Sequence, residues 1–123
     1  MNTKISPKQF GDVLLKESLV KQFADGLGVF ANRNFKKGEV VVKWSLKHLT
    51  EKEYQNLPAY ERTNFCHTRN GTIHYYSEPE RHVNRSKNPN VFPDFKQEAD
   101  IALRDIKLGE ELTILDSTQE DFE

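Results

Sequence analysis

The sequence is poor in cysteine, because Cys66 is the single one among 123 residues. One cysteine excludes an internal disulfide framework and any zinc site built from several cysteines, so we expect no metal site. Long apolar runs are also missing, since the longest aliphatic run is Val40-Val41-Val42, far shorter than a membrane span. The first ten residues lack the apolar segment of a secretory signal. We therefore expect a cytoplasmic protein with no membrane partner.

An excess of charge of one sign is absent as well. The 18 Lys and Arg residues nearly balance the 19 Asp and Glu residues, which gives a net charge of -1. This balance argues against a uniformly basic nucleic-acid binder, and we expect no direct contact with nucleic acid. Basic side chains gather near residues 81–87 and acidic ones near residues 116–123. Solvated surface is the ordinary interpretation of both clusters.

Large aromatic side chains are what the sequence does contain. Eight Phe, four Tyr and one Trp supply buriable surface to a chain that is only 36% hydrophobic. A mean hydropathy of -0.77 predicts a small core, while the aromatic content argues against disorder. A mass of 14.3 kDa is that of one domain.

Turn signals and short β-favouring segments divide the chain. We expect a helix at residues 51–56, because Thr50 and Glu53 form a capping-box pattern and Pro58 ends the helix. A second helical turn is expected at residues 59–65, and Asn70-Gly71 is a strong hairpin signal. The segment 39–44 should pair back as a hairpin on the chain that precedes the turn at residues 36–38. Further strands are expected at residues 13–15, 72–76, 99–103 and 111–115, around an irregular polar segment at 77–90.

Three segments stand out, although each has an ordinary structural explanation. Residues 26–31 (GLGVFA) contain two glycines that would let a backbone come close to a ligand, but no third glycine or helix follows as a dinucleotide site requires. Residues 84–90 (NRSKNPN) are typical of side chains that bond their own backbone in turns. Residues 101–106 and 108–113 are consistent with a plain β-hairpin.

In this order and at these separations, the three segments make the chain resemble a SET domain, the fold of the main family of protein-lysine methyltransferases. The opening motif of the family stands here as residues 26–31 and residues 37–40 (KGEV). The central motif, Arg-Phe-apolar-Asn-His-Ser-Cys-x-Pro-Asn, is matched by residues 81–90 (RHVNRSKNPN). The closing motif is matched by residues 102–106 (ALRDI) and 109–113 (GEELT).

The resemblance implies a single SET-like domain over residues 1–123, with a core of about residues 13–116 and an acidic tail at 117–123. It implies a mainly β fold of the β-clip type, with several small β-sheets around a C-terminal pseudoknot and one or two short helices. The length is similar to that of minimal bacterial and viral members, which lack flanking pre- and post-domains.

The resemblance also implies a cofactor, S-adenosylmethionine, and a protein substrate that offers a lysine side chain. By match to the motifs, Gly26, Leu27 and Gly28 would run past the methionine part of the cofactor, and Asn84 would hold its amino group. Arg85 would contact the adenine through its backbone. Phe122 is expected to cover the adenine, by analogy with an aromatic residue that follows the domain in other members.

The chain departs from the family in ways that bear on catalysis. The tyrosine that closes the lysine channel in the family corresponds to Asp116, the central histidine to Arg85, and the motif cysteine to Lys87. An ionised aspartate near the substrate amine favours its protonated form, which is not a nucleophile. Tyr75 and Tyr76 are the expected replacements for the channel tyrosine, although packing is the ordinary role of at least one of them.

Three functions stay open on the sequence. The first is a SET-family enzyme that methylates a protein lysine, with weak activity. The second is a catalytically degenerate SET-domain protein that acts as a binding module. The third is a methyltransferase that acts on a different nucleophile, with Asp116 as its base.

Overall fold

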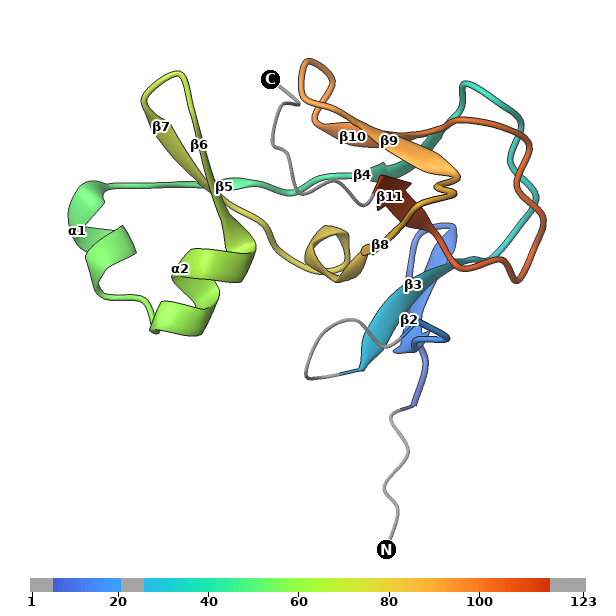
Figure 1. Cartoon of the computed structure of the whole chain (residues 1–123), viewed down its shortest axis with the longest axis horizontal. Coiled ribbons are helices and arrows are strands. Elements are labelled where there is room, and N and C mark those ends of the chain that lie inside the picture. Colours follow the sequence, from blue (N-terminus) through green and yellow to red (C-terminus); the bar gives the residue numbers. More distant parts are fainter. Residues whose placement is uncertain (1–5, 21–25, 116–123) are drawn as a thin grey trace, which may run out of the picture.

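The computed structural model describes residues 6–20 and 26–115. Within these residues the strands form four small sheets, accompanied by two short α-helices (Figure 1). The expected mainly β architecture of several small sheets with one or two helices is therefore confirmed. Asp116, Phe122 and the acidic tail lie outside the described residues. No helix in the described part of the chain is long and apolar enough to cross a membrane.

The first sheet is antiparallel and carries the glycine-rich segment. Its strands are β1 (Lys8–Phe10), β2 (Val13–Glu17) and β3 (Leu27–Ala31), in the order β1-β2-β3. Val29, Phe30 and Ala31 are buried, as are Val13 and Leu15 on the facing strand. The sheet thus turns an apolar face toward the core and holds Gly28 at a fixed place opposite Lys16.

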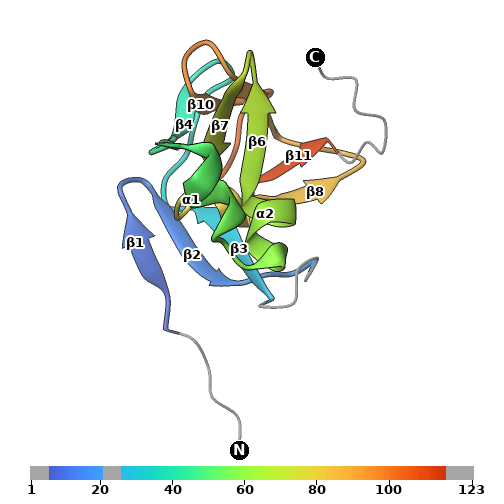
Figure 2. The ribbon, with the colours of Figure 1, turned by 90° about the vertical axis from the view of Figure 1, so that its left-hand side faces the viewer.

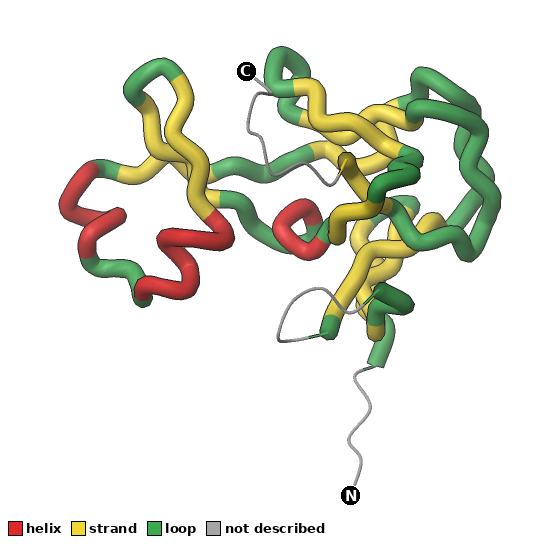
Figure 3. The backbone as a smooth tube through the Cα atoms, in the orientation of Figure 1, coloured by secondary structure: helices red, strands yellow, loops and turns green. Residues whose placement is uncertain are grey.

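The second sheet corrects one expectation of the sequence. β4 (Val40–Lys43) pairs with β10 (Ala99–Ala102), which pairs in turn with β9 (Val91–Asp94). The predicted hairpin between β4 and the strand before it is wrong. The chain between β3 and β4 runs instead beside the loop between β10 and β11 (Figure 3). There Phe35 and Ile106 exchange backbone hydrogen bonds of 2.8 and 2.9 Å. A turn signal in the sequence predicts where the chain changes direction, but it does not predict which strand the next segment pairs with.

The third sheet and both helices form a group that extends to one side of the molecule (Figures 1 and 2). Its strands are β5 (Lys47–Leu49), β7 (Thr72–Tyr75) and β6 (Cys66–Arg69), in the order β5-β7-β6. The helices are α1 (Glu51–Gln55) and α2 (Ala59–Phe65). The Thr50–Glu53 capping box is confirmed, with Glu53 N donating to Thr50 Oγ1 at 3.1 Å. The hairpin turn is confirmed as well, since Asn70 and Gly71 both have positive φ.

The fourth sheet joins the two later motifs. β8 (Asn84–Ser86) and β11 (Thr113–Leu115) are parallel neighbours, with Asn84 opposite Thr113 and Arg85 opposite Ile114. A 3₁₀ turn, η1 (Glu80–His82), precedes β8 in the segment expected to be irregular. The plain hairpin considered for residues 101–113 does not form, because β10 and β11 have other partners. The threading of the C-terminal segment under a loop stays a prediction.

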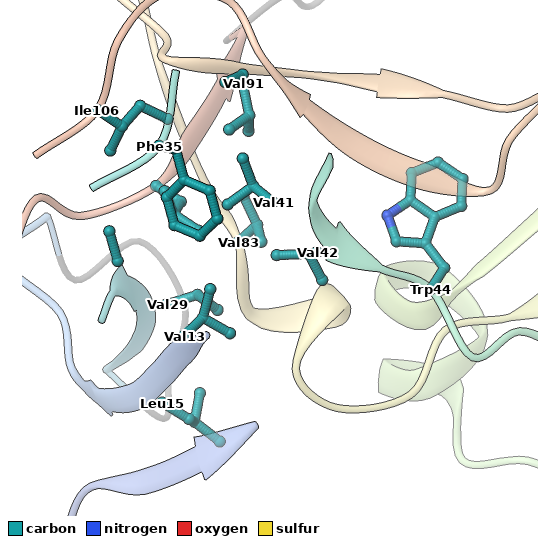
Figure 4. Close-up of a cluster of buried hydrophobic side chains, with 13 residues drawn as sticks. Val13, Leu15, Val29, Phe35, Val41, Val42, Trp44, Val83, Val91 and Ile106 are labelled. Carbon is teal, nitrogen blue, oxygen red and sulfur yellow. The ribbon is translucent and has the colours of Figure 1, made fainter. Parts of the chain in front are cut away.

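The core lies where the sheets meet. Its side chains are mostly aliphatic, and Figure 4 shows them grouped between the strands, with Trp44 extending from the end of β4 to one side. Phe35, Ile106 and Leu112 are among the largest fully buried side chains. The small cluster matches the low hydrophobic content of the sequence.

Candidate functional site

A buried polar cluster lies beneath the glycine-rich strand. Asn84 on β8 is 0% exposed, and its side-chain amide nitrogen donates to Ser18 Oγ at 2.9 Å, Leu27 O at 3.0 Å and Glu111 Oε2 at 3.1 Å. Glu111 Oε2 also accepts from Ser18 Oγ at 2.7 Å, and Oε1 accepts from the backbone of Leu19 at 2.8 Å. These bonds tie β8 and the closing motif to the end of β2 and the start of β3.

The partners of Asn84 fix the orientation of its amide. A backbone carbonyl and a carboxylate can only accept, so the nitrogen must face them. The amide oxygen Oδ1 then remains, and it is buried without a hydrogen-bond partner. A buried acceptor without a donor costs about 1–3 kcal/mol, which a ligand that carries an N–H would relieve.

The three residues of the glycine-rich segment have different roles. Gly26 has φ of +68°, a conformation that favours glycine, and its carbonyl accepts from Ser18 N at 2.7 Å. The Leu27 carbonyl is engaged by Asn84. Gly28 has no room for a side chain, because the Glu111 carboxylate occupies the space of a Cβ. Sequence reasoning did not single out Glu111 or Ser18, although Glu111 lies within the closing motif.

A cavity of about 260 Å³ lies on the other face of the β8–β11 pair. Side chains alternate along a strand: Asn84 on β8 lies in the polar cluster, while the next residue, Arg85, and its partner Ile114 on β11 line the cavity. The remaining lining comes from α2, β6, η1, β9, β10 and the end of β11, and from the connections that follow β4, β7, η1 and β9. These lining residues are Trp44, Thr63, Asn64, Cys66, His67, Tyr76, Glu80, Arg81, Val83, Pro93, Phe95, Asp100 and Leu115.

Aromatic rings form one wall of the cavity. Trp44 meets Tyr76 edge to face with ring centroids 5.7 Å apart, and Phe95 in the same manner at 5.3 Å. His67 stacks on Phe95 with ring centroids 5.3 Å apart. Burial, followed by the charges of Asp100 and Glu80, raises the pKa of Tyr76 to about 12. Tyr76 therefore keeps its proton at neutral pH.

Two buried carboxyl groups complete the lining. Glu80 is 7% exposed and Asp100 is 3% exposed. Burial raises the pKa of Asp100 to about 7, a hydrogen bond from Trp44 opposes the rise, and the charge of Glu80 adds to it. The sequence did not point to either residue. The alternating pattern of residues 99–103 predicts one buried face, whereas all four residues of β10 are buried between β4 and β9.

The two tyrosines predicted as channel residues separate in the structure. Tyr76 lines the cavity. Tyr75 faces α2 instead, where its hydroxyl donates to Glu61 Oε1 at 2.9 Å and accepts from Arg81 Nη1 at 3.3 Å. Asp116 and Phe122, the other two predicted site residues on the C-terminal side, lie outside the described residues.

Three histidines lie in a row across the third sheet. His74 on β7 pairs with His48 on β5 and with His67 on β6. The His48 and His74 rings meet edge to face at 4.8 Å. In the part of the chain that the structure describes, no three side chains of His, Cys, Asp or Glu are arranged to hold a metal ion.

Comparisons with known proteins cover most of the chain. Residues 26–115 match the model of the SET domain family. A candidate histone methyltransferase of Plasmodium falciparum superposes with a TM-score of 0.69 at 15% identity, over 89% of this chain and 96% of that one. A humanized mutant of the Chaetomium thermophilum Polycomb Repressive Complex 2, bound to the inhibitor GSK126, superposes with a TM-score of 0.61 at 25% identity over 84% of this chain.

These likenesses have a limited reach. At 15% identity the Plasmodium structure shows the fold alone. The present chain spans 14% of the matching chain of the Polycomb complex, so the similarity there concerns one domain of a much larger protein. The comparison with curated proteins finds no match.

Proposed function

The chain belongs to the SET domain family, whose model matches residues 26–115, and we propose that it is a protein-lysine N-methyltransferase that uses S-adenosylmethionine. One observation carries the proposal. The β8–β11 pair has a buried acceptor, Asn84 Oδ1, on one face and an aromatic-lined cavity on the other. In an in-line methyl transfer the donor and the amine approach each other from opposite directions, and the β8–β11 pair borders one candidate place for each of them.

The residues present fit the amino-acid end of the cofactor. Asn84 Oδ1 is a buried oxygen without a donor, and an ammonium group supplies one. The nitrogen of Asn84 is fully used within the protein, so only the amino group, and not the carboxylate, suits this side chain. Gly26, Leu27 and Gly28 would run along the methionine part, and the backbone of Arg85 would contact the adenine. When bound, the cofactor supplies a methyl group on a positively charged sulfur.

The cavity residues would serve the substrate side. The rings of Trp44, Tyr76 and Phe95 exclude water around an alkyl chain and restrict its orientation. Tyr76 keeps its O–H, because its pKa is about 12, and can donate a hydrogen bond or accept one through its oxygen. The protein partner is a substrate that inserts a lysine side chain.

A binding module is the second candidate. Leu115 ends the described chain at the edge of the cavity, and the next residue, Asp116, stands where the family motif has its tyrosine. The family places a phenol there to orient the amine, and a carboxylate would favour the charged amine instead. Retention of a substrate or product without transfer would then be the function of the same cavity.

Calorimetry with S-adenosylmethionine tests the cofactor site on wild type, Asn84→Ala and Asn90→Ala. Asn90 is the matched control, because it is 3% exposed and also bonds the closing motif: Oδ1 accepts from Thr113 N and Nδ2 donates to Glu111 O. Both variants lose buried hydrogen bonds, so circular dichroism must first show that each is folded. We expect Asn84→Ala to weaken binding by about 10-fold or more, as loss of a charge-assisted hydrogen bond does, and Asn90→Ala to retain it.

Transfer is measured separately, with methyl-labelled cofactor and a mixed pool of host proteins. Binding together with transfer to lysine supports the enzyme. Binding without transfer favours the module. Absence of binding in folded wild-type protein contradicts the proposal.

A further inference from the structure

We propose that Glu111 is a positioning residue that sets which end of the Asn84 amide faces the cofactor, and that it thereby makes this subsite select an amine over a carboxylate. The inference rests on the proposed function, because it specifies how the same cofactor site distinguishes the groups of its ligand. Its basis is a set of hydrogen bonds that uses the amide nitrogen of Asn84 within the protein and leaves its buried Oδ1 without a partner.

The amide nitrogen of Asn84 is surrounded by three oxygen atoms. Ser18 Oγ lies at 2.9 Å, Leu27 O at 3.0 Å and Glu111 Oε2 at 3.1 Å. A carbonyl oxygen and a carboxylate oxygen can only accept, whereas a hydroxyl can also donate. Turning the amide over would place its oxygen against the same three atoms. The orientation is therefore fixed for as long as none of the three atoms can act as a donor toward Asn84.

Glu111 removes that possibility at the hydroxyl. Ser18 Oγ has one hydrogen, and it donates this hydrogen to Glu111 Oε2 at 2.7 Å. With its hydrogen engaged, Ser18 Oγ accepts from Asn84 Nδ2 and, at 2.9 Å, from Val20 N. Glu111 thus acts on the amide in two ways. It accepts from Asn84 directly, and it commits the hydrogen of Ser18 so that the hydroxyl oxygen also serves as an acceptor.

The carboxylate of Glu111 is itself held in place. Its Oε1 accepts from Leu19 N at 2.8 Å, and its Oε2 lies in the space that a Cβ on Gly28 would fill. Ser18 N also donates to Gly26 O at 2.7 Å, so the same group of residues joins the end of β2 to the start of the glycine-rich segment. Because both carboxylate oxygens are bonded, ligand binding does not have to order this group first.

The orientation of the amide determines which ligand group fits. A ligand that brings an N–H forms a bond with Asn84 Oδ1, whereas a carboxylate oxygen would meet a second acceptor. The charge of Glu111 favours an ammonium as well, and no ion pair joins this residue to a basic side chain within residues 6–20 and 26–115. This amine belongs to the cofactor and does not react. Holding it in its charged form therefore does not oppose transfer, as it would at the substrate lysine.

Glu111→Gln tests the orientation with little change of shape. The oxygen of the new side chain can still accept, but its NH₂ can donate to the oxygen of a turned Asn84 amide. The hydrogen of Ser18 is then free to do the same, because no carboxylate engages it. A turned amide would lose mainly its bond to Leu27 O, so both orientations become accessible in the variant.

Two control variants separate this effect from general damage. Glu110→Gln changes the neighbouring glutamate of the same motif, whose side chain accepts from Lys107 N at 2.6 Å and from Arg104 Nη1 at 3.3 Å. Ser18→Ala removes a bond from the polar cluster but introduces no donor, so the amide should keep its orientation. Circular dichroism must first show that each variant is folded.

Calorimetry compares three ligands in these proteins: S-adenosylmethionine, its decarboxylated form, which keeps the amine, and its deaminated form, which keeps the carboxylate. We expect wild type to bind the decarboxylated form about 10-fold more tightly than the deaminated form. In Glu111→Gln this ratio should fall below about 3-fold, while Glu110→Gln and Ser18→Ala should keep the ratio of the wild type. The ratio is the informative quantity, since a variant that merely loosens the fold weakens both ligands alike.

Nuclear magnetic resonance tests the orientation in protein without ligand. With isotope-labelled asparagine, the side-chain NH₂ of Asn84 should show Overhauser contacts to the Ser18 side chain, because the two groups are hydrogen-bonded. We expect these contacts to weaken in Glu111→Gln and to persist in Glu110→Gln. If Glu111→Gln does not fold, the wild-type spectrum still decides, because absence of the contacts there overturns the inference.

Failure of the inference and failure of the proposed function give different results. Binding of S-adenosylmethionine with the same preference for the amine in wild type and folded Glu111→Gln overturns the inference and leaves the proposed enzyme standing. A wild type that prefers the deaminated form overturns the inference as well. Absence of binding by all three ligands contradicts the proposed enzyme, and in that case Overhauser contacts that weaken in Glu111→Gln still support the positioning of Asn84 by Glu111.

Discussion

The carboxylate of Glu111 occupies the space that a side chain on Gly28 would need. The same carboxylate accepts hydrogen bonds from Ser18, Leu19 and Asn84, so it cannot move aside without breaking them. Gly28 does not have positive φ, and the requirement for glycine there is one of space. The glycine of the opening motif and the glutamate of the closing motif thus form one structural unit, although 82 positions separate them in the sequence.

Gly28→Ala should destabilise the fold through this overlap. Overpacking of a buried site costs about 1–3 kcal/mol, and we expect urea denaturation to show a loss of unfolding free energy in that range. The loss should shrink in a Glu111→Ala background, where the carboxylate is gone and only Ser18 Cβ, 3.0 Å from the position of the added carbon, still crowds the site. A double-mutant cycle measures the coupling, and additive effects of the two changes would contradict the assignment.

Local signals in the sequence predicted local structure well. The Thr50–Glu53 capping box and the Asn70-Gly71 turn each depend on residues close together in the chain, and both are present as expected. The strand at residues 13–15 was also placed correctly within β2. The family motifs singled out Asn84 as a cofactor ligand, and this stays a prediction; they did not reveal the buried polar cluster in which its amide N–H groups are all used inside the protein.

What the sequence could not supply depends on contacts between distant segments. Asp100 is buried because β10 lies between β4 and β9, and a single polar residue in a strand gives no sign of which face is covered. The buried carboxyl group of Glu80 accepts hydrogen bonds from Ser45 and Ser77. Ser45 is far from η1 in the sequence, and no spacing rule predicts that the two come together. The pairing of β4 with β10 escaped prediction for the same reason.

Asp100→Asn should raise the melting temperature more at about pH 8 than at about pH 5. The folded pKa of Asp100 lies near 7, above the ordinary value of 3.8, so the folded state binds the proton more tightly than the unfolded state. Its contribution to stability is complete below about pH 3.8 and is lost as the pH rises through about 7. The side-chain amide of the Asp100→Asn variant would not titrate, so the variant does not lose stability in this pH range for that reason.

Asp94→Asn is the control for this experiment. Asp94 is partly exposed, and hydrogen bonds from Gln97 and Lys96 lower its pKa. Its contribution has the opposite sign, so the variant should not gain stability at high pH. An equal change in melting temperature at both pH values for Asp100→Asn would show that the carboxyl group has no raised pKa in the fold.

His67→Phe should flatten the acid side of the stability profile. Burial, then the charges of His74 and Arg69, lowers the pKa of His67 below 6.5, so the folded state resists protonation. The corresponding stability is present above about pH 6.5 and is lost as the pH falls below it. Phenylalanine keeps the stacking on Phe95 and removes the titration.

Urea denaturation between about pH 5 and pH 7 measures the slope of unfolding free energy against pH in His67→Phe. Thr68→Val, an exposed change on the same strand, should leave that slope as in the wild type. His74 on the neighbouring strand has its own pKa lowered by burial, so part of the slope should persist in His67→Phe. A slope identical to that of the wild type would show that His67 does not resist protonation in the folded state.

Asp116→Tyr tests the position at which the chain departs most from the family motif. We expect the wild type to transfer methyl groups to lysine weakly, because an anion beside the amine favours the protonated form, which has no lone pair to attack with. A tyrosine would orient the amine without a full charge, and transfer should rise by about 10-fold, equivalent to roughly 1.4 kcal/mol in the barrier. The measurement compares wild type and variant in methyl transfer from labelled cofactor to a mixed pool of host proteins. Strong transfer by the wild type that collapses in Asp116→Tyr would identify the carboxylate as the base for another nucleophile, because a group that merely hinders the reaction cannot be needed for it.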